Sequence, residues 1–142
     1  MPIEQQSTAA SDHLQILIVE DNFINQKLLR MILAKRGHET DIAENGVEAV
    51  EAVLRKAYDL VFMDIAMPVM DGFEAARNIR DKMNSPHLPV IIAVTAYARE
   101  EDQIQSMASG MQDYLSKPFR IPHIDALLDK WTPYIHTYKS KV

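Results

Sequence analysis

The sequence predicts an α/β protein in which five parallel strands form one sheet and helices cover both of its faces. Two observations support this fold class. Segments with the pattern of a strand alternate five times with segments that have the pattern of a helix. Three of the strand segments, 14–20, 59–63 and 89–95, are almost continuously apolar, which is typical of parallel strands buried on both faces. With 142 residues, the chain has the usual size of a single domain.

The first two units each combine a strand with a helix. The strand 14–20 precedes a helix that ends at Gly37, a residue type that often follows the last helical turn. A weaker strand, 38–43, comes next, and the turn Asn45-Gly46 opens the second helix. Apolar residues at helical spacing identify the two helices: Ile24, Leu28, Met31 and Ile32 in the first, and Val47, Val50 and Leu54 in the second.

The last three units follow the same plan. The strand 59–63 precedes a helix introduced by Asp71-Gly72, the strand 89–95 a helix ended at Gly110, and the strand 114–116 a helix from about residue 121. The apolar stripes of these helices are Phe73, Ala76 and Ile79; then Ile104, Met107 and Ala108; then Ile124, Leu127, Leu128 and Trp131.

The order of the strands follows from their burial. The most apolar strands, the first, third and fourth, should be central, and crossovers between parallel strands are right-handed. These constraints favour a flavodoxin-like (βα)5 doubly wound sheet with the order 2-1-3-4-5. We expect residues 1–13 to form a flexible leader, residues 14–135 the domain and residues 136–142 a C-terminal tail.

Composition excludes several classes of function. The absence of cysteine removes disulfides, thiolate zinc sites and cysteine nucleophiles. A formal charge of -5 argues against nucleic-acid binding, which depends on clustered Lys and Arg. No apolar run approaches the ~20 residues needed to cross a bilayer, and the start has no signal-peptide pattern. We therefore expect no membrane association and a cytoplasmic location.

Polar residues follow the central strands where those strands end. Glu20 and Asp21 come after the first strand, Asp64 after the third, Thr95 after the fourth and Lys117 after the fifth. Because parallel strands end at the same edge of a sheet, these residues should lie together. Three carboxylates there would repel one another by roughly 4 kcal/mol per close pair, so the cluster needs protons or a cation.

A hard divalent cation suits this cluster. Mg²⁺ prefers oxygen ligands and usually keeps water and a phosphate oxygen in its coordination shell. Next to such an ion, a carboxylate such as Asp64 can attack a phosphoryl group, while Lys117 and Thr95 stabilise the charge on that group. The sequence therefore indicates phosphoryl transfer to Asp64.

Each of these residues also has an ordinary interpretation when it is taken alone. Glu20 and Asp21 before a helix are typical of capping. Thr95 is a common β-branched strand residue, Lys117 a common surface charge, and Tyr114 a common half-buried strand residue. Their joint placement at one edge of the sheet favours a shared functional site over these separate interpretations.

Four motifs give the sequence a family resemblance. They are ILIVEDN at 16–22, FMDIAMPVMDG at 62–72, VTA at 94–96 and YLSKPF at 114–119. In this order and spacing, they make residues 14–131 resemble a response-regulator receiver domain of two-component signalling. The sequence around the first two motifs is most similar to receivers of hybrid histidine kinases, and stand-alone receivers share it.

The resemblance implies a role for each candidate residue. Asp64 would accept a phosphoryl group from a phosphohistidine on a histidine kinase or histidine phosphotransfer protein. Mg²⁺, with Mn²⁺ as an expected substitute, would be bound by Asp21, Asp64 and the backbone carbonyl of Ala66, with Glu20 acting mostly through water. Thr95 and Lys117 would contact the phosphoryl oxygens, Tyr114 would rotate inward as a switch, and the Lys117-Pro118 peptide would be cis.

The resemblance also implies a signalling domain, not an enzyme with a separate substrate. The domain would catalyse only its own phosphorylation and dephosphorylation. Phosphorylation would change the surface of the last two helices and the strand between them, which would bind a downstream protein. A phosphate relay and a diffusible switch would both retain Asp64, so the sequence leaves these two uses open.

Two other classes of protein share part of the pattern. A phosphatase of the haloacid-dehalogenase type also attacks phosphate with an Asp after a strand, but its second acid would stand where this chain has Ala66. A nucleotide or flavin binder of the same fold would need a first loop that cradles phosphate, whereas the residues EDN at 20–22 would repel an anion. The chain also lacks the G-x-G-x-x-G and Walker A patterns.

Overall fold

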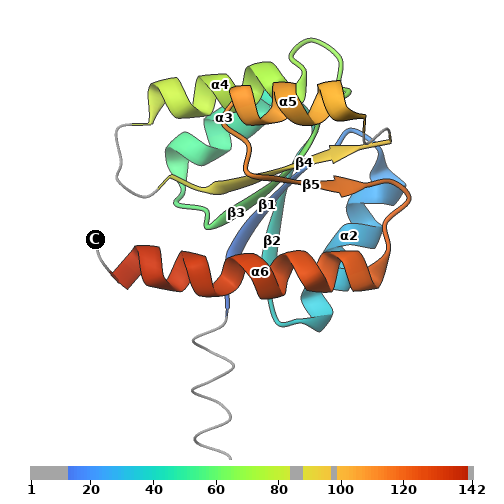
Figure 1. The fold of residues 1–142 in the computed structure, drawn as a ribbon, viewed down its shortest axis with the longest axis vertical. Helices are drawn as coiled ribbons and strands as arrows, with labels where there is room; N and C mark the ends of the chain where they lie inside the picture. The colour runs from blue at the N-terminus through green and yellow to red at the C-terminus, as the bar shows by residue number, and fades with distance from the viewer. Residues whose placement is uncertain (1–12, 84–87, 97–98, 141–142) are drawn as a thin grey trace, which may run out of the picture.

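Strands and helices alternate along the chain and form one parallel sheet (Figure 1). The computed structural model describes residues 13–83, 88–96 and 99–140. The elements are β1 (Gln15–Val19), α2 (Phe23–Lys35), β2 (Glu39–Ala43), α3 (Gly46–Arg55), β3 (Leu60–Asp64), α4 (Gly72–Lys82), β4 (Val90–Thr95), α5 (Glu100–Ala108), β5 (Asp113–Ser116) and α6 (Ile121–Ser140). The strand order is β2-β1-β3-β4-β5, and every neighbouring pair is parallel, so the predicted topology is confirmed.

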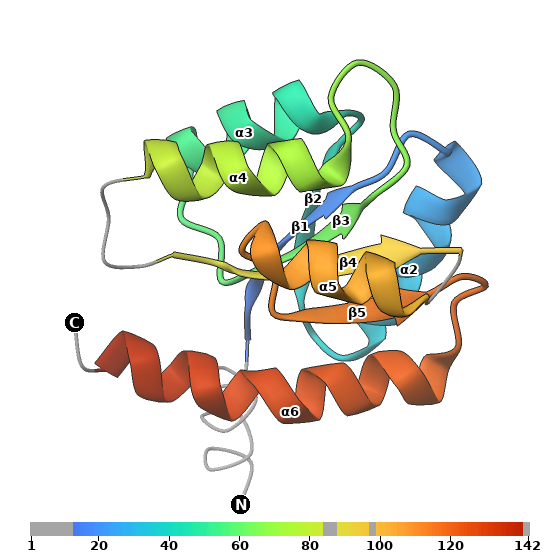
Figure 2. The same ribbon diagram turned by 45° about the horizontal axis from the view of Figure 1, so that its top comes forward.

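Helices pack on both faces of the sheet, so the domain has two hydrophobic cores (Figure 2). α2 and α6 cover one face, and α3 and α4 cover the other, with α5 beside α4 (Figures 1 and 2). Residues of β3 alternate between the two cores: Leu60 and Phe62 belong to the core under α2 and α6, and Val61 and Met63 to the other. Burial on both faces explains why β1, β3 and β4 read as continuous apolar runs.

The inward faces of two helices differ from the stripes identified in the sequence. In α2 the buried residues are Leu29, Ile32 and Leu33, whereas Ile24 is 73% exposed and Leu28 and Met31 are also exposed. In α5 the only buried residue is Ser106, and Met107 is 73% exposed. In α2, more than one set of residues satisfies the helical period, and packing against the sheet selects Leu29, Ile32 and Leu33. In α5, none of the predicted apolar residues is buried. Ile104 and Ala108 of α5 are exposed as well, and so are Val47 and Leu54 of α3.

The ends of the described chain also differ from expectation. Residues 1–12 of the expected leader lie outside the described residues, but His13 is held by the backbone carbonyl of Gly37, 2.6 Å from its Nδ1. At the other end, α6 continues to Ser140, so residues 136–140 extend the helix past the expected boundary at residue 135. No helix in the described part of the chain combines the length and apolarity that crossing a membrane requires.

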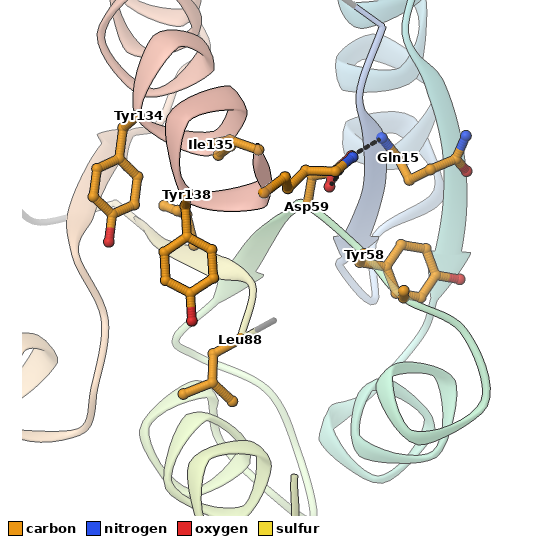
Figure 3. A pocket seen from close by; sticks show the side chains of 10 residues that line it. Gln15, Tyr58, Asp59, Leu88, Tyr134, Ile135 and Tyr138 are labelled. Carbon is orange, nitrogen blue, oxygen red and sulfur yellow. Dashed lines mark hydrogen bonds and ion pairs between the residues drawn. The ribbon is translucent and has the colours of Figure 1, made fainter. Parts of the chain in front are cut away.

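The last turns of α6 pack against the edge where the strands begin (Figure 3). Ile135 is buried there, and Tyr134 and Tyr138 line a pocket together with Leu88. Lys139 Nζ lies 3.1 Å from one carboxylate oxygen of Asp59, and the other oxygen accepts a hydrogen bond of 2.8 Å from the backbone N–H of Gln15. This pocket lies at the edge of the sheet opposite the carboxyl ends of the strands.

Candidate functional site

Three carboxylates meet at the carboxyl end of the sheet. β1 and β3 are adjacent, so Glu20 and Asp21, which follow β1, lie beside Asp64 at the end of β3. The ligand oxygens of Glu20, Asp21 and Asp64 lie within 4.8 Å of one another. Glu20 and Asp64 are buried, whereas Asp21 is exposed. The structure therefore brings together the acidic residues that the sequence predicted to converge.

Lys117 supplies positive charge to this cluster. Its Nζ lies 3.0 Å from Glu20 Oε1 and 3.1 Å from Asp64 Oδ2. Its backbone N–H donates a hydrogen bond of 2.8 Å to the carbonyl of Thr95, which fixes the turn after β5 to the end of β4. The Lys117-Pro118 peptide is cis, as the resemblance implied. One ammonium among three carboxylates leaves the site with excess negative charge.

The pKa values of the buried groups reflect this environment. Burial raises the pKa of Glu20, although the hydrogen bond from the Asn22 amide and the close contact with the Lys117 ammonium oppose the rise. Burial alone would lower the pKa of Lys117, but its contacts with Glu20 and Asp64 outweigh that effect and raise the pKa. Lys117 is therefore charged at neutral pH. Among the carboxylates of the cluster, Glu20 is the one whose ionised form is destabilised by burial.

The oxygen atoms of the cluster fit a divalent cation. Glu20 Oε1 is buried and receives no aligned hydrogen bond from the described residues, since its 3.0 Å contact with Lys117 is an ion pair of poor alignment. Asp21 is exposed and open to solvent beside it. A buried oxygen with a vacant hydrogen-bonding direction, within a group of carboxylates, matches the preference of Mg²⁺ for oxygen ligands combined with water.

The loop after β3 fixes the orientation of Asp64. The amide of Ala66 donates a hydrogen bond of 3.2 Å to Asp64 Oδ1, so both carboxylate oxygens have partners. Asp71 caps α4 by accepting a hydrogen bond from the amide of Glu74. A Cβ atom at Gly72 would collide with the backbone carbonyl of Asp64, so glycine permits α4 to begin directly against the end of β3.

Thr95 and Tyr114 lie on the neighbouring strands. Asp64 is in register with Val94, so Thr95 is one residue further along β4 at the same edge. Tyr114 is half-buried in β5, where its ring packs against the core under α3 and α4 and lies edge-on to His123 at 6.2 Å. The structure thus places both residues on the two strands that lead from Asp64 toward the surface of α5 and α6.

The sequence alone did not predict one contact of the site. Gln26, in the first turns of α2, donates a hydrogen bond of 2.7 Å from its side chain to the backbone carbonyl of Glu20. A glutamine four residues after the helix cap at Asn22 looks like an ordinary surface residue in the sequence. Only the geometry of the loop between β1 and α2 shows that it reaches back to the acidic pair.

Comparisons with known proteins agree with this geometry. Residues 16–129 match the family of response regulator receiver domains. Hybrid signal transduction histidine kinase B of Dictyostelium discoideum is 44% identical over 120 residues, which cover 78% of this chain and 6% of that protein. The polar-differentiation response regulator DivK of Brucella anthropi is 38% identical over 107 residues, or 75% of this chain and 86% of DivK. The chain therefore spans only a small part of the hybrid kinase but most of the single-domain regulator.

Two solved structures are similar in fold and sequence. The receiver domain of a sensor histidine kinase from Pseudomonas aeruginosa, with a magnesium ion coordinated in its active site cleft, has a TM-score of 0.77 and 36% identity, and covers 85% of this chain and 98% of that one. The receiver domain of the Saccharomyces cerevisiae response regulator Ssk1, crystallised with the histidine phosphotransfer signaling protein Ypd1, has a TM-score of 0.78 and 36% identity, and covers 84% and 89%.

Proposed function

The chain belongs to the family of response regulator receiver domains, which are signalling modules of two-component phosphorelays, and on this premise we propose that Asp64 is its phosphoacceptor. The observation that carries the proposal is the position of Asp64: it ends a buried central strand, and its carboxylate contacts Lys117 within a cluster of three acids. In the reaction, one carboxylate oxygen of Asp64 forms a bond to phosphorus. The bond between phosphorus and the donor's imidazole nitrogen breaks, and that nitrogen keeps the electron pair.

We propose that Asp21, Asp64 and the backbone carbonyl of Ala66 hold Mg²⁺, with Glu20 acting through water. Support comes from the buried Glu20 oxygen that lacks an aligned hydrogen bond and from the magnesium ion in the related Pseudomonas aeruginosa receiver. When bound, the ion neutralises charge on the transferring phosphoryl group. Mn²⁺ should replace it, because Mn²⁺ also accepts carboxylate, carbonyl and water ligands.

The other residues have separate roles in this proposal. Lys117 pairs with a phosphoryl oxygen, and the Thr95 hydroxyl donates a hydrogen bond to another. The shift of Thr95 toward the phosphoryl group opens space for Tyr114, which turns inward from its half-buried position in β5. The surface of α5, β5 and α6 then changes and presents a different face to a downstream protein.

The donor would be a phosphohistidine on a histidine kinase or a histidine phosphotransfer protein. Ssk1, whose receiver resembles this chain, was crystallised with such a phosphotransfer protein. Exposed apolar side chains border the site: Phe23 and Ile24 at the start of α2, and Val69, which is 92% exposed, in the loop after β3. These side chains would make the apolar contacts that let a partner bring its histidine to Asp64.

Intact-protein mass tests the chemistry directly. The protein is incubated with acetyl phosphate, with and without Mg²⁺, and wild type is compared with Asp64→Asn. We expect a single phosphoryl adduct that requires both Mg²⁺ and Asp64. The Asp64→Asn variant should remain folded, with an unchanged or higher melting temperature, because the amide is nearly isosteric and removes one of three repelling charges. An adduct on Asp64→Asn, or an unfolded variant, would contradict the assignment.

A second experiment separates relay from switch. Phosphorylated protein is mixed with a histidine phosphotransfer protein, and the phosphoryl group is followed by mass. Efficient return to histidine supports a relay. Phosphorylation-dependent binding of a protein at the surface of α5, β5 and α6 supports a diffusible switch, which should be lost when Met107, exposed on α5, is changed to a charged residue.

A further inference from the structure

Asp21 differs from the other acids of the site in how it is held. Glu20 and Asp64 are buried and contact Lys117, and each also accepts a hydrogen bond from a backbone amide. Asp21 is exposed, and within the described part of the chain its carboxylate forms no hydrogen bond or ion pair. The position of the Asp21 carboxylate therefore depends on the backbone on either side of it.

That backbone is fixed at the peptide between Glu20 and Asp21. The Glu20 amide donates to the carbonyl of Ala43 in β2 at 3.0 Å, and the Glu20 carbonyl accepts from Gln26 Nε2 at 2.7 Å. The carbonyl of Glu20 and the amide of Asp21 belong to the same planar peptide. By holding the Glu20 carbonyl, the side chain of Gln26 therefore fixes the orientation of this peptide and, with it, the direction of the Asp21 side chain.

Gln26 is well placed to hold this peptide. Asn22 caps α2 by accepting a hydrogen bond of 2.9 Å from the amide of Asn25, and the amide of Gln26 donates to the carbonyl of Asn22 at 3.0 Å. The helix thus fixes the backbone of Gln26, and its partly buried side chain needs to reach only the end of β1. Few rotamers remain for the side chain, so little entropy opposes the contact.

Repulsion among the acids makes such a restraint necessary. The carboxylate oxygens lie within 4.8 Å of one another, a distance at which like charges in a partly buried site repel strongly. Glu20 and Asp64 are locked by burial, so Asp21 is the member that can swing into solvent when no cation is bound. We propose that Gln26 is a positioning residue that holds Asp21 at the acidic cluster in the metal-free protein, an inference that rests on the proposed function of the cluster.

The test uses Gln26→Met, which keeps the length of the side chain but removes the donor, with Gln105→Met as the matched control on the exposed surface of α5. Mg²⁺ binding is measured by calorimetry on unphosphorylated protein. We expect Gln26→Met to bind Mg²⁺ about fivefold more weakly, the factor expected for loss of one neutral hydrogen bond. At saturating Mg²⁺, the phosphorylation rate should stay within about twofold of wild type, because the acceptor and Lys117 are unchanged.

A second measurement needs neither metal nor phosphate. Amide hydrogen exchange at Asn22, whose N–H donates to Glu20 Oε2 at 3.1 Å, should be faster in Gln26→Met than in wild type and unchanged in Gln105→Met. Wild-type Mg²⁺ affinity together with unchanged exchange in Gln26→Met would overturn the proposal. If wild type takes no phosphoryl group while Mg²⁺ binding responds to Gln26→Met, the proposed function falls and the role of Gln26 stands. If wild type binds no Mg²⁺, the exchange rate alone decides.

Discussion

Lys117 is the only cation among the described residues that contacts the acidic cluster. It bridges Glu20 and Asp64 at 3.0 and 3.1 Å and so offsets the cost of burying two carboxylates. A cation bound by the three acids would compensate the same charge from the solvent side. The ammonium and such a cation would thus reduce the same repulsion, but only the ammonium belongs to the folded chain.

Lys117→Ala separates these two contributions. We expect the phosphorylation rate to fall at least about tenfold, because the charge that we propose to pair with the phosphoryl group is lost. Mg²⁺ affinity should stay the same or rise, since a competing positive charge is removed. Stability without Mg²⁺ should fall by about 1 to 3 kcal/mol, measured by urea denaturation.

Lys82→Ala is the matched control for this prediction. Lys82 ends α4, far from the site, and is exposed, so its loss removes the same charge without touching the cluster. The control should phosphorylate at the wild-type rate. A large loss of Mg²⁺ affinity in Lys117→Ala would show that lysine helps to hold the metal, contrary to the division of roles proposed above.

Val69 adopts a backbone conformation that is unusual for its residue type. Its φ is 71°, and the amide of Met70 donates to the carbonyl of Pro68, so Val69 is the central residue of a γ-turn. For a β-branched residue, this conformation costs about 1 to 2 kcal/mol. The side chain is 92% exposed, so packing does not compensate for the strain.

Val69→Gly should therefore stabilise the protein by about 0.5 to 1 kcal/mol, because the relief of strain exceeds the added entropy of the unfolded chain. Thermal unfolding measures the change, with Val69→Ala as the control that keeps a Cβ atom at positive φ and should gain little. If glycine lowers the melting temperature, the strain at this turn is smaller than its φ implies. A gain in stability combined with weaker transfer from a phosphohistidine partner would connect Val69 to partner binding.

The acidic cluster was predictable from the sequence because topology alone determines it. Glu20, Asp21 and Asp64 follow central parallel strands, and such strands end at one edge of the sheet. The restraint on Asp21 was not predictable, because Gln26 acts through a side-chain hydrogen bond to a backbone carbonyl, and any glutamine on a helix surface looks the same in the sequence.

At the scale of elements, β5 and α6 are joined by one half-buried acid. Asp113 accepts hydrogen bonds from Trp131 Nε1 at 2.9 Å and Lys130 Nζ at 3.0 Å, and its other oxygen accepts from the amide of Tyr114. Burial would raise the pKa of Asp113, but these hydrogen bonds and the charge of Lys130 outweigh it, so the pKa is lowered. Because Tyr114 is the proposed switch residue, this junction also supports the surface that would respond to phosphorylation.

Asp113→Asn tests this junction through its pH dependence. The pKa of Asp113 is lower in the folded protein than in the unfolded chain, where it is about 4, so its stabilising effect is complete above that value and is lost as pH falls through the folded pKa. At about pH 7, we expect Asp113→Asn to be less stable than wild type by about 1 to 2 kcal/mol. The difference should shrink below about pH 4 in urea denaturation. A difference that stays constant with pH would show that Asp113 is not stabilised as a carboxylate.

The helices were predictable in position but only partly in orientation. The apolar stripe predicted for α4 is confirmed, since Phe73, Ala76 and Ile79 are all buried. In α2 the apolar residues exceed what the sheet can cover, and the excess remains on the surface, whereas in α5 all three predicted stripe residues are exposed. A period of 3.6 residues identifies a helix, but it does not choose between adjoining apolar stripes; in a protein that binds partners, some of these stripes face the solvent.

At the scale of the whole molecule, the main feature that the sequence did not predict is the length of α6. Pro133 interrupts the apolar pattern after Trp131 and is typical of a helix end, yet the helix continues to Ser140. The reason is tertiary packing: Ile135 is buried against the sheet, and Lys139 pairs with Asp59. The boundary of the folding unit at residue 135 remains a proposal that truncation can test.

Removal of residues 136–142 should leave a folded domain that is still phosphorylated, because the site lies at the other edge of the sheet. Loss of the Lys139 contact with Asp59 should cost about 1 kcal/mol and lower the melting temperature by about 3 to 6 °C. Lys139→Ala in the full chain isolates the ion pair from the rest of the segment. An unfolded truncation would place the boundary beyond residue 135.

Asp59 has a consequence for how the domain can be joined to other polypeptides. It contacts Gln15 at the start of β1 and Lys139 near the end of α6, so the chain enters and leaves the domain beside the same side chain (Figure 3). The described chain therefore begins and ends on the same side of the domain, with the full length of the sheet between that side and Asp64. A larger protein can accommodate such a module at its end or within its sequence without covering the edge of the sheet that carries Asp64.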